Sequence, residues 1–218
     1  MVVPVFATSE YNSLKNMVPV PEFFWHATPL QFLPAILAAG ELRASANPRP
    51  TALARRRKLG LERFVHLSFS SQTPLLANKL QRGYPHALLA FDPEIASQPG
   101  AAYLKWNTKR WAHRDEFIPI TDPQEKSAFL DSWRCGKFPS AELLIPEQLS
   151  LTYATGLLVR SQAEWEFLAS FGLNTPPMTL APERFPVAPE ADLSALWTWA
   201  AECQKNEALL PSLHLPFD

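Results

Sequence analysis

Short apolar runs that end at prolines constrain the fold of this chain more than any other feature. The run Ala87–Phe91 lies between Pro85 and Pro93, and the run Ala141–Ile145 ends at Pro146. Runs this short are typical of buried strands, because proline fixes φ and has no N–H to continue a ladder. With 22 prolines and only 7 glycines, the chain is expected to consist of short elements joined by rigid loops.

Other segments show strand or helix periodicity in an irregular order. The further predicted strands are Phe23–His26, Phe64–Phe69, Phe117–Ile120 and Ala154–Val159. The predicted helices are 30–39, which ends at Gly40, then 74–82, 125–133, 161–171, which begins with Ser161 and Glu164 as a capping box, and 192–209. Strands and helices do not alternate strictly, so the fold class is α+β.

The 218 residues, of which 47% are hydrophobic, are enough for one substantial core. We expect a lead-in segment over 1–22 and one main domain over 23–175. The proline-rich bridge and C-terminal helix of 176–218 should pack on that domain. We expect a monomer in the cytoplasm, since no run is long enough to span a bilayer and no secretion signal is apparent. Cys135 and Cys203 then read as free thiols.

Charge and motif content exclude several classes of function. The net charge of −1 excludes a uniformly basic surface for nucleic acid, although local basic patches remain allowed. The glycine-rich phosphate loops of Rossmann and P-loop proteins are absent from the sequence. The five histidines have no metal-ligand spacing, so we predict no metal site.

Glu142 is the one charged residue inside an apolar strand. Alternation puts it on the same strand face as Leu144, with Leu143 and Ile145 on the other face. One interpretation is an edge-strand glutamate that faces water. The other is a partly buried carboxylate at a cleft, which is costly unless it is used or paired.

His26 ends the first predicted strand, and Thr28 lies between it and the short helix that follows. This arrangement presents an imidazole and a hydroxyl at the mouth of a cleft. The alternatives are a structural hydrogen bond for His26 and an N-cap for Thr28, because Pro29 fits the first helical position.

Two basic clusters complete the candidate residues. Arg55, Arg56 and Arg57 form either a phosphate clamp or a solvated loop. The stretch 105–114 interleaves tryptophan with cations, as surfaces for single-stranded nucleic acid do, although its tryptophans could equally anchor the loop to the core. Its candidate contacts to nucleic acid are Lys105, Trp106, Lys109, Arg110 and Trp111.

Three segments together resemble the DarT-type (DUF4433) DNA ADP-ribosyltransferases of the ADP-ribosyltransferase superfamily. The stretch 24–42 is similar to the family's opening His-x-Thr strand and following helix, and 64–76 is similar to its second segment. The stretch Ala141–Ile145 is similar to the Ala-Glu strand that supplies the family's catalytic glutamate. The likeness spans about residues 23–170, and the C-terminal part has no counterpart.

The resemblance implies a split β-sheet core with flanking helices and transfer of ADP-ribose from NAD, the co-substrate, to a nucleobase. It implies Glu142 and Arg56 as catalytic residues, with Arg55 and Arg57 as the other candidates for the family's arginine. It further implies single-stranded DNA as the acceptor, a role as the toxin of a toxin–antitoxin or phage-defence system, and a macrodomain antitoxin as partner. The implied contacts to NAD are His26, Thr28, Gln31, Arg55, Arg57, Ser68 and Phe69.

A second branch of the superfamily leaves alternatives open. The stretches 64–68, 80–85 and 87–92 resemble the NAD-dependent RNA 2′-phosphotransferases, which share the fold. The alternatives are therefore a phosphotransferase of that kind, an ADP-ribosyltransferase acting on RNA or protein, or a non-catalytic module that binds nucleic acid.

Overall fold

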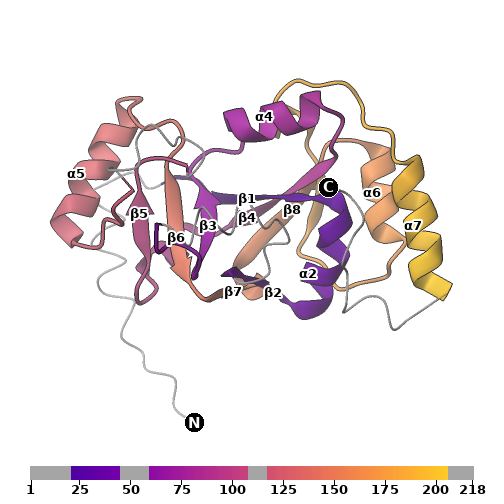
Figure 1. Ribbon diagram of the computed structural model, residues 1–218, viewed down its shortest axis with the longest axis horizontal. Coiled ribbons are helices and arrows are strands. Elements are labelled where there is room, and N and C mark those ends of the chain that lie inside the picture. Colours follow the sequence, from indigo (N-terminus) through magenta and orange to yellow (C-terminus); the bar gives the residue numbers. More distant parts are fainter. Residues whose placement is uncertain (1–20, 45–58, 108–116, 206–218) are drawn as a thin grey trace, which may run out of the picture.

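The computed structural model describes residues 21–44, 59–107 and 117–205. Within these residues a mostly antiparallel sheet has the strand order β5-β6-β3-β1-β4-β8-β9 (Figure 1). Its strands are β1 (Phe24–Pro29), β3 (Phe64–Ser68), β4 (His86–Phe91), β5 (Ala102–Leu104), β6 (Glu142–Pro146), β8 (Ala154–Val159) and β9 (Met178–Leu180). The short strands β2 (Glu41–Arg43) and β7 (Gln148–Ser150) form a separate pair.

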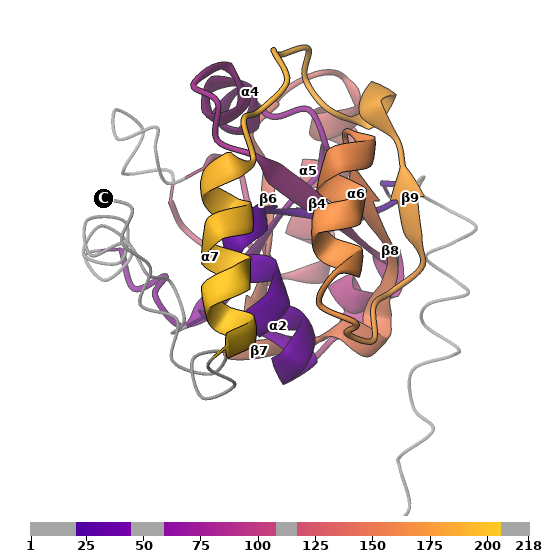
Figure 2. The same ribbon diagram turned by 90° about the vertical axis from the view of Figure 1, so that its right-hand side faces the viewer.

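Helices cover both faces of the sheet. They are α2 (Leu33–Ala39), α4 (Pro74–Gln81), α5 (Pro123–Arg134), α6 (Gln162–Ala169) and α7 (Ser194–Lys205). Figure 2 shows α2, α6 and α7 gathered in front of the sheet. In Figure 1, α4 lies above the sheet and α5 lies at its β5 end. The predicted α+β class with flanking helices is confirmed.

Strand alternation divides the core between these two faces. Leu89 and Phe91 pack into the large cluster that includes residues of α2, α6 and α7. Leu88 and Ala90, the alternate residues of β4, pack with Trp25 against α4. Each face of the central strands is therefore buried under a helical layer, which explains why β4 reads as a continuous apolar run.

The pairing between the neighbouring strands β1 and β3 is limited to a single residue pair. On one side β1 pairs with β4 along its whole length, from Phe24↔Phe91 to Pro29↔His86. On the other side it meets β3 only at Trp25↔Ser68. The two strands part beyond that pair, and the predicted split in the sheet is confirmed.

The predicted helix over 30–39 is in fact two elements. A 3-10 turn covers Leu30–Phe32, and the α-helix begins at Leu33. Pro34 has no N–H to donate to the carbonyl of Leu30, so a continuous α-helix cannot run through this position. Gly40 ends the helix in the left-handed region (φ 70°), as predicted.

The predicted strand over 117–120 is wrong. Ile120 makes only an isolated bridge to Tyr103. Pro119 cannot donate to a ladder, and Ile118 is largely exposed, so the segment pairs at one point and then leaves the sheet. Ser161 caps α6 as predicted, since its Oγ accepts a hydrogen bond from the backbone N–H of Glu164.

Candidate active site

Glu142 is the first residue of β6 and lies between two neighbouring strands. It stands directly opposite Ser68 of β3 and Leu104 of β5. Residues that oppose each other in antiparallel strands share a face, so Glu142 lies on the α4 side of the sheet with Ser68 and Trp25. Glu142 is 7% exposed. The structure therefore favours the buried carboxylate over the water-facing edge residue.

His66 of β3 is the partner of this carboxylate. Its Nδ1 lies 2.7 Å from Oε2 of Glu142, and its Nε2 lies 3.3 Å from the carbonyl oxygen of Leu61. Both side chains are nearly inaccessible, at 4% for His66 and 9% for Glu142. A buried carboxylate with a close ring N–H donor keeps its charge far more cheaply than an unpaired one.

A cavity of about 240 Å³ is lined by two neighbours of Glu142. Ser68, opposite Glu142, and Ser140, two residues before it, both line the cavity. The N-terminus of α4 forms another part of the wall, where Thr73 Oγ1 caps the helix by accepting from the N–H of Leu76. The positive end of the helix dipole thus lies at the cavity wall. The complete lining is Ser68, Thr73, Pro74, Leu75, Asn78, Asn107 and Ser140.

His26 and Thr28 lie on the opposite face of the sheet from Glu142. They alternate with Trp25 along β1, and their neighbours Phe24 and Ala87 belong to the large core. His26 is half-buried, and its Nδ1 lies 3.2 Å from the carbonyl oxygen of His66, just where β1 and β3 part. His26 is thus linked to the glutamate through the backbone of His66.

Thr28 does not cap the following helix. The residue before the 3-10 turn is Pro29, and no side-chain hydrogen bond caps that turn. Thr28 is instead buried within β1, opposite Ala87. Gln31 lies half-buried in the turn itself.

The two candidate residues of the second family-like segment, Ser68 and Phe69, lie in different surroundings. Ser68 lines the cavity, whereas Phe69 points into the aromatic core. The ring of Phe69 is 4.9 Å from that of Phe24 and 5.2 Å from that of Trp133. These ring contacts give Phe69 a packing role.

The basic stretch 105–114 is described only as far as Asn107. Trp106 is half-buried and packs edge-on against Phe138, with the ring centroids 5.3 Å apart. The Nζ of Lys105 lies 5.7 Å from the centroid of the same ring. These contacts fix the start of the stretch beside Asn107, which lines the cavity. The candidates Arg55, Arg56, Arg57, Lys109, Arg110 and Trp111 lie outside the described residues.

Sequence reasoning missed His66 and most of the cavity lining. His66 precedes Ser68 by two positions, so the alternation of β3 signals that they share a face. That this face meets Glu142 depends on the register of β3 against β6, which links residues 76 positions apart. Thr73 could have been found as an N-cap before Pro74, whereas Ser140, Asn78 and Asn107 carry no local signal.

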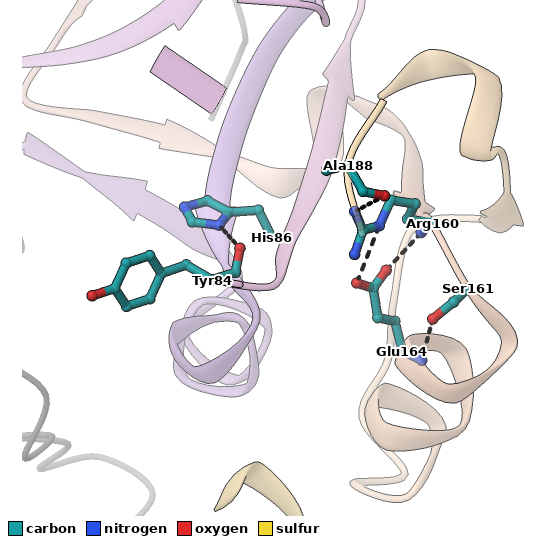
Figure 3. Close-up of polar contacts among 6 residues, drawn as sticks. All are labelled: Tyr84, His86, Arg160, Ser161, Glu164 and Ala188. Carbon is teal, nitrogen blue, oxygen red and sulfur yellow. Dashed lines mark hydrogen bonds and ion pairs between the residues drawn. The ribbon is translucent and has the colours of Figure 1, made fainter. Parts of the chain in front are cut away.

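A second buried carboxylate, Glu164 of α6, lies outside this site (Figure 3). Its Oε2 accepts a 2.7 Å hydrogen bond from the backbone N–H of Arg160, while its Oε1 lies 3.9 Å from Arg160 Nε and has no hydrogen bond. Burial raises the pKa of Glu164, and the backbone hydrogen bond and charge of Arg160 only partly oppose that rise.

Two further findings concern the described residues as a group. No cluster of three His, Cys, Asp or Glu side chains among them could hold a metal ion. None of the helices in this part of the chain has the length and hydropathy needed to cross a membrane.

Sequence comparison alone finds no relative of the chain. No protein-family model matches it, and no curated protein matches it by sequence.

Comparison with solved structures does find matches. DarT of Thermus sp. 2.9 in complex with ADP-ribosylated ssDNA superposes with a TM-score of 0.60 at 15% identity, over 78% of this chain and 98% of the other. The same protein in complex with NAD⁺ gives 0.55 at 14% identity, over 78% and 100%. Thermosipho africanus DarTG in complex with ADP-ribose gives 0.58 at 17% identity, over 74% of this chain and 50% of the other. The chain therefore has the DarT-like ADP-ribosyltransferase fold that its sequence motifs predict.

Proposed function

We propose that the protein is an NAD-dependent ADP-ribosyltransferase that modifies a nucleobase in single-stranded nucleic acid. The acceptor that we propose is DNA. One observation carries this proposal. Glu142 is a buried carboxylate with Oε2 held by His66 and with no hydrogen bond to Oε1 from the described residues, and its neighbours Ser68 and Ser140 line a cavity. A carboxylate so placed is typical of a catalytic group. The fold supports this, since DarT structures carry NAD⁺ and ADP-ribosylated ssDNA.

The cavity suits one end of NAD and not the whole dinucleotide. At about 240 Å³ it is smaller than the pockets that enclose drug-sized ligands, which have volumes of roughly 300–1,000 Å³. Its serine and asparagine side chains, with the Glu142 carboxylate beside them, are hydrogen-bond partners for a ribose and an amide. We therefore assign the nicotinamide ribose to this cavity.

The rest of NAD would extend along the opening between β1 and β3. His26 lies at that opening, and Gln31 follows it in the chain, so these two residues would hold the adenosine side. The buried Thr28 would support the strand. Arg56, with Arg55 and Arg57, remains the proposed partner of the phosphates, because guanidinium groups pair bidentately with phosphate oxygens.

Glu142 would act on the ribose. Breaking the bond between ribose and nicotinamide leaves positive charge on the sugar, and a buried carboxylate stabilises such charge more strongly than an exposed one. The free Oε1 would accept a hydrogen bond from the ribose 2′-hydroxyl. When a nitrogen of the acceptor base bonds to the ribose, its proton would pass to Glu142 and then to water.

The stretch that begins at Lys105 would hold the acceptor strand. Trp106 packs on Phe138 next to the cavity residue Asn107, and Lys105 offers a cation, while Lys109, Arg110 and Trp111 continue the same pattern in the sequence. Bases stack on aromatic rings and phosphates meet cations in proteins that bind single strands. A base has to leave its stack before an enzyme can reach its ring atoms, which favours a single-stranded acceptor.

A protein with this activity would modify the DNA of its own cell, so we propose that it acts as a toxin in the cytoplasm with a macrodomain antitoxin as its counterpart. Support comes from Thermosipho africanus DarTG, whose structure contains ADP-ribose. This chain matches only half of the length of that protein. Co-expression with a neighbouring macrodomain protein should restore the growth of cells that produce this chain.

The destination of labelled ADP-ribose tests the proposal. Purified protein is incubated with NAD labelled in its adenylate part and with single-stranded DNA, double-stranded DNA, RNA or cell extract. We expect release of nicotinamide and label in single-stranded DNA. Label in RNA or protein would correct the acceptor class, loss of a terminal RNA 2′-phosphate would indicate the phosphotransferase, and NAD binding without nicotinamide release would leave a non-catalytic module.

A further inference from the structure

His66 touches the proposed catalytic carboxylate, yet the reaction as proposed gives it no part. The register of β3 against β6 places it there, since Ser68 opposes Glu142 and His66 opposes Leu144. His66 and Glu142 are therefore diagonal neighbours on one face of the sheet. Their side chains come within 2.7 Å of each other, and both are shielded from solvent.

Both ring nitrogens of His66 face hydrogen-bond acceptors. Nδ1 faces the carboxylate of Glu142, and Nε2 faces the carbonyl oxygen of Leu61 at 3.3 Å. A neutral imidazole has a single N–H, so it would turn a lone pair toward one of the two oxygens. With an acceptor at each ring nitrogen, the hydrogen-bond geometry fits an imidazolium that donates to both.

This pairing distinguishes the two oxygens of Glu142. Oε2 is tethered to His66, whereas Oε1 has no hydrogen bond within the described part of the chain. A charge-assisted hydrogen bond fixes the direction of the carboxylate and preserves its charge in a buried position. The cavity-lining residues Ser68 and Ser140 stand on either side of Glu142, across the ladder and along the chain.

We propose that His66 is a positioning residue that, as an imidazolium, holds Oε2 of Glu142 and leaves Oε1 to meet the ribose. This inference rests on the proposed function. His66 does not touch the substrate, so its contribution is to pre-orient the group that does. The expected consequence is a loss of turnover with little change in NAD binding when the N–H donor is removed.

The protonation of the ring is measured directly by ¹⁵N NMR of the full chain at neutral pH. We expect His66 to carry a proton on both Nδ1 and Nε2 in the wild type. In Glu142→Gln, which removes the carboxylate charge, we expect only one protonated ring nitrogen. A neutral His66 in the wild type would overturn the inference.

Kinetics separate positioning from a merely structural role. His66→Ala should lower kcat for nicotinamide release by about 10- to 100-fold, the value of a hydrogen bond to a charged group, with KM for NAD nearly unchanged. His66→Asn places an amide N–H near the position of Nδ1 and should recover part of the loss. Unchanged kcat in His66→Ala, or a lower stoichiometry of NAD binding in both variants, would contradict the positioning role.

His86 provides a matched control. It is also a buried histidine on a strand of the main sheet, and its Nδ1 lies 2.8 Å from the carbonyl oxygen of Tyr84 (Figure 3). His86→Asn should keep the wild-type kcat. The two proposals fail separately. A wild type that releases no nicotinamide with any acceptor contradicts the proposed function, whereas a neutral His66 in an active wild type contradicts only the role of His66.

Discussion

Among the described residues two glutamates are buried, and they differ in the group that holds one of their oxygens. Glu142 has one oxygen tied to a histidine, and its neighbours Ser68 and Ser140 line a cavity. Glu164 has one oxygen tied to a backbone N–H, while the other is enclosed by protein without a hydrogen bond. Burial is similar in both, at 7% and 1% exposure. Arg160 and Ser161 beside Glu164 also line a cavity, of about 410 Å³. Neither burial nor a nearby cavity therefore marks a catalytic carboxylate by itself; the two sites differ in the group that holds the tied oxygen, a histidine side chain for Glu142 and the backbone for Glu164.

The largest expected difference between the two sites is in catalysis. Glu142→Gln removes the charge that would stabilise the ribose and should lower the rate of nicotinamide release by roughly a thousandfold. Glu164→Gln removes an equally buried charge and should leave that rate unchanged per folded molecule. Both rates are measured with saturating NAD and single-stranded DNA, with circular dichroism as the check on folding. Equal rates of nicotinamide release in Glu142→Gln and Glu164→Gln would mean that the two glutamates do not differ in catalysis.

The next difference is in stability. Arg160→Met leaves the Glu164 carboxylate without its nearby cation and should lower the free energy of unfolding by about 1–3 kcal/mol at neutral pH. The double variant with Glu164→Gln should recover most of that loss, because no buried charge is then left unpaired. Urea unfolding of the wild type, both single variants and the double variant gives the coupling. A double variant as unstable as Arg160→Met would mean that Arg160 acts by packing.

The smallest effect is in the pH dependence of folding. Because burial raises the pKa of Glu164, its contribution to stability is complete below its ordinary value of 4.5 and is lost as the pH rises through the raised value in the folded state. Glu164→Gln cannot ionise, so its stability relative to the wild type should improve as the pH rises above 4.5. Urea unfolding at a series of pH values measures this trend, and a parallel pH profile for both proteins would argue against it.

The sequence predicts the central strands well, because they are buried on both faces. Strands β4 and β6 are apolar runs that prolines delimit, and their identity follows from local chemistry alone. Strands β5 and β9 have three residues each and were missed. Such short segments carry no periodicity, and they become strands only because β6 and β8 offer edges to pair with.

The site was predictable only in part for a similar reason. Glu142 is conspicuous as a charge within an apolar strand, and Ser68 follows from the second family-like segment. The partnership of His66 with Glu142 depends on which strands become neighbours and in which register. For the same reason the sequence does not reveal that His26 and Glu142 face opposite sides of the sheet. Alternation assigns residues to the two faces within one strand, but it does not relate the faces of different strands.

The junction of β1 and β3 has a consequence for how such proteins diverge. A link made by one main-chain pair, Trp25↔Ser68, requires extended backbone and no particular side chains. The gap between the parting strands can therefore keep its place while many of the surrounding side chains differ. The match to the DarT fold at 15% identity, with no match to a curated protein by sequence, is consistent with this.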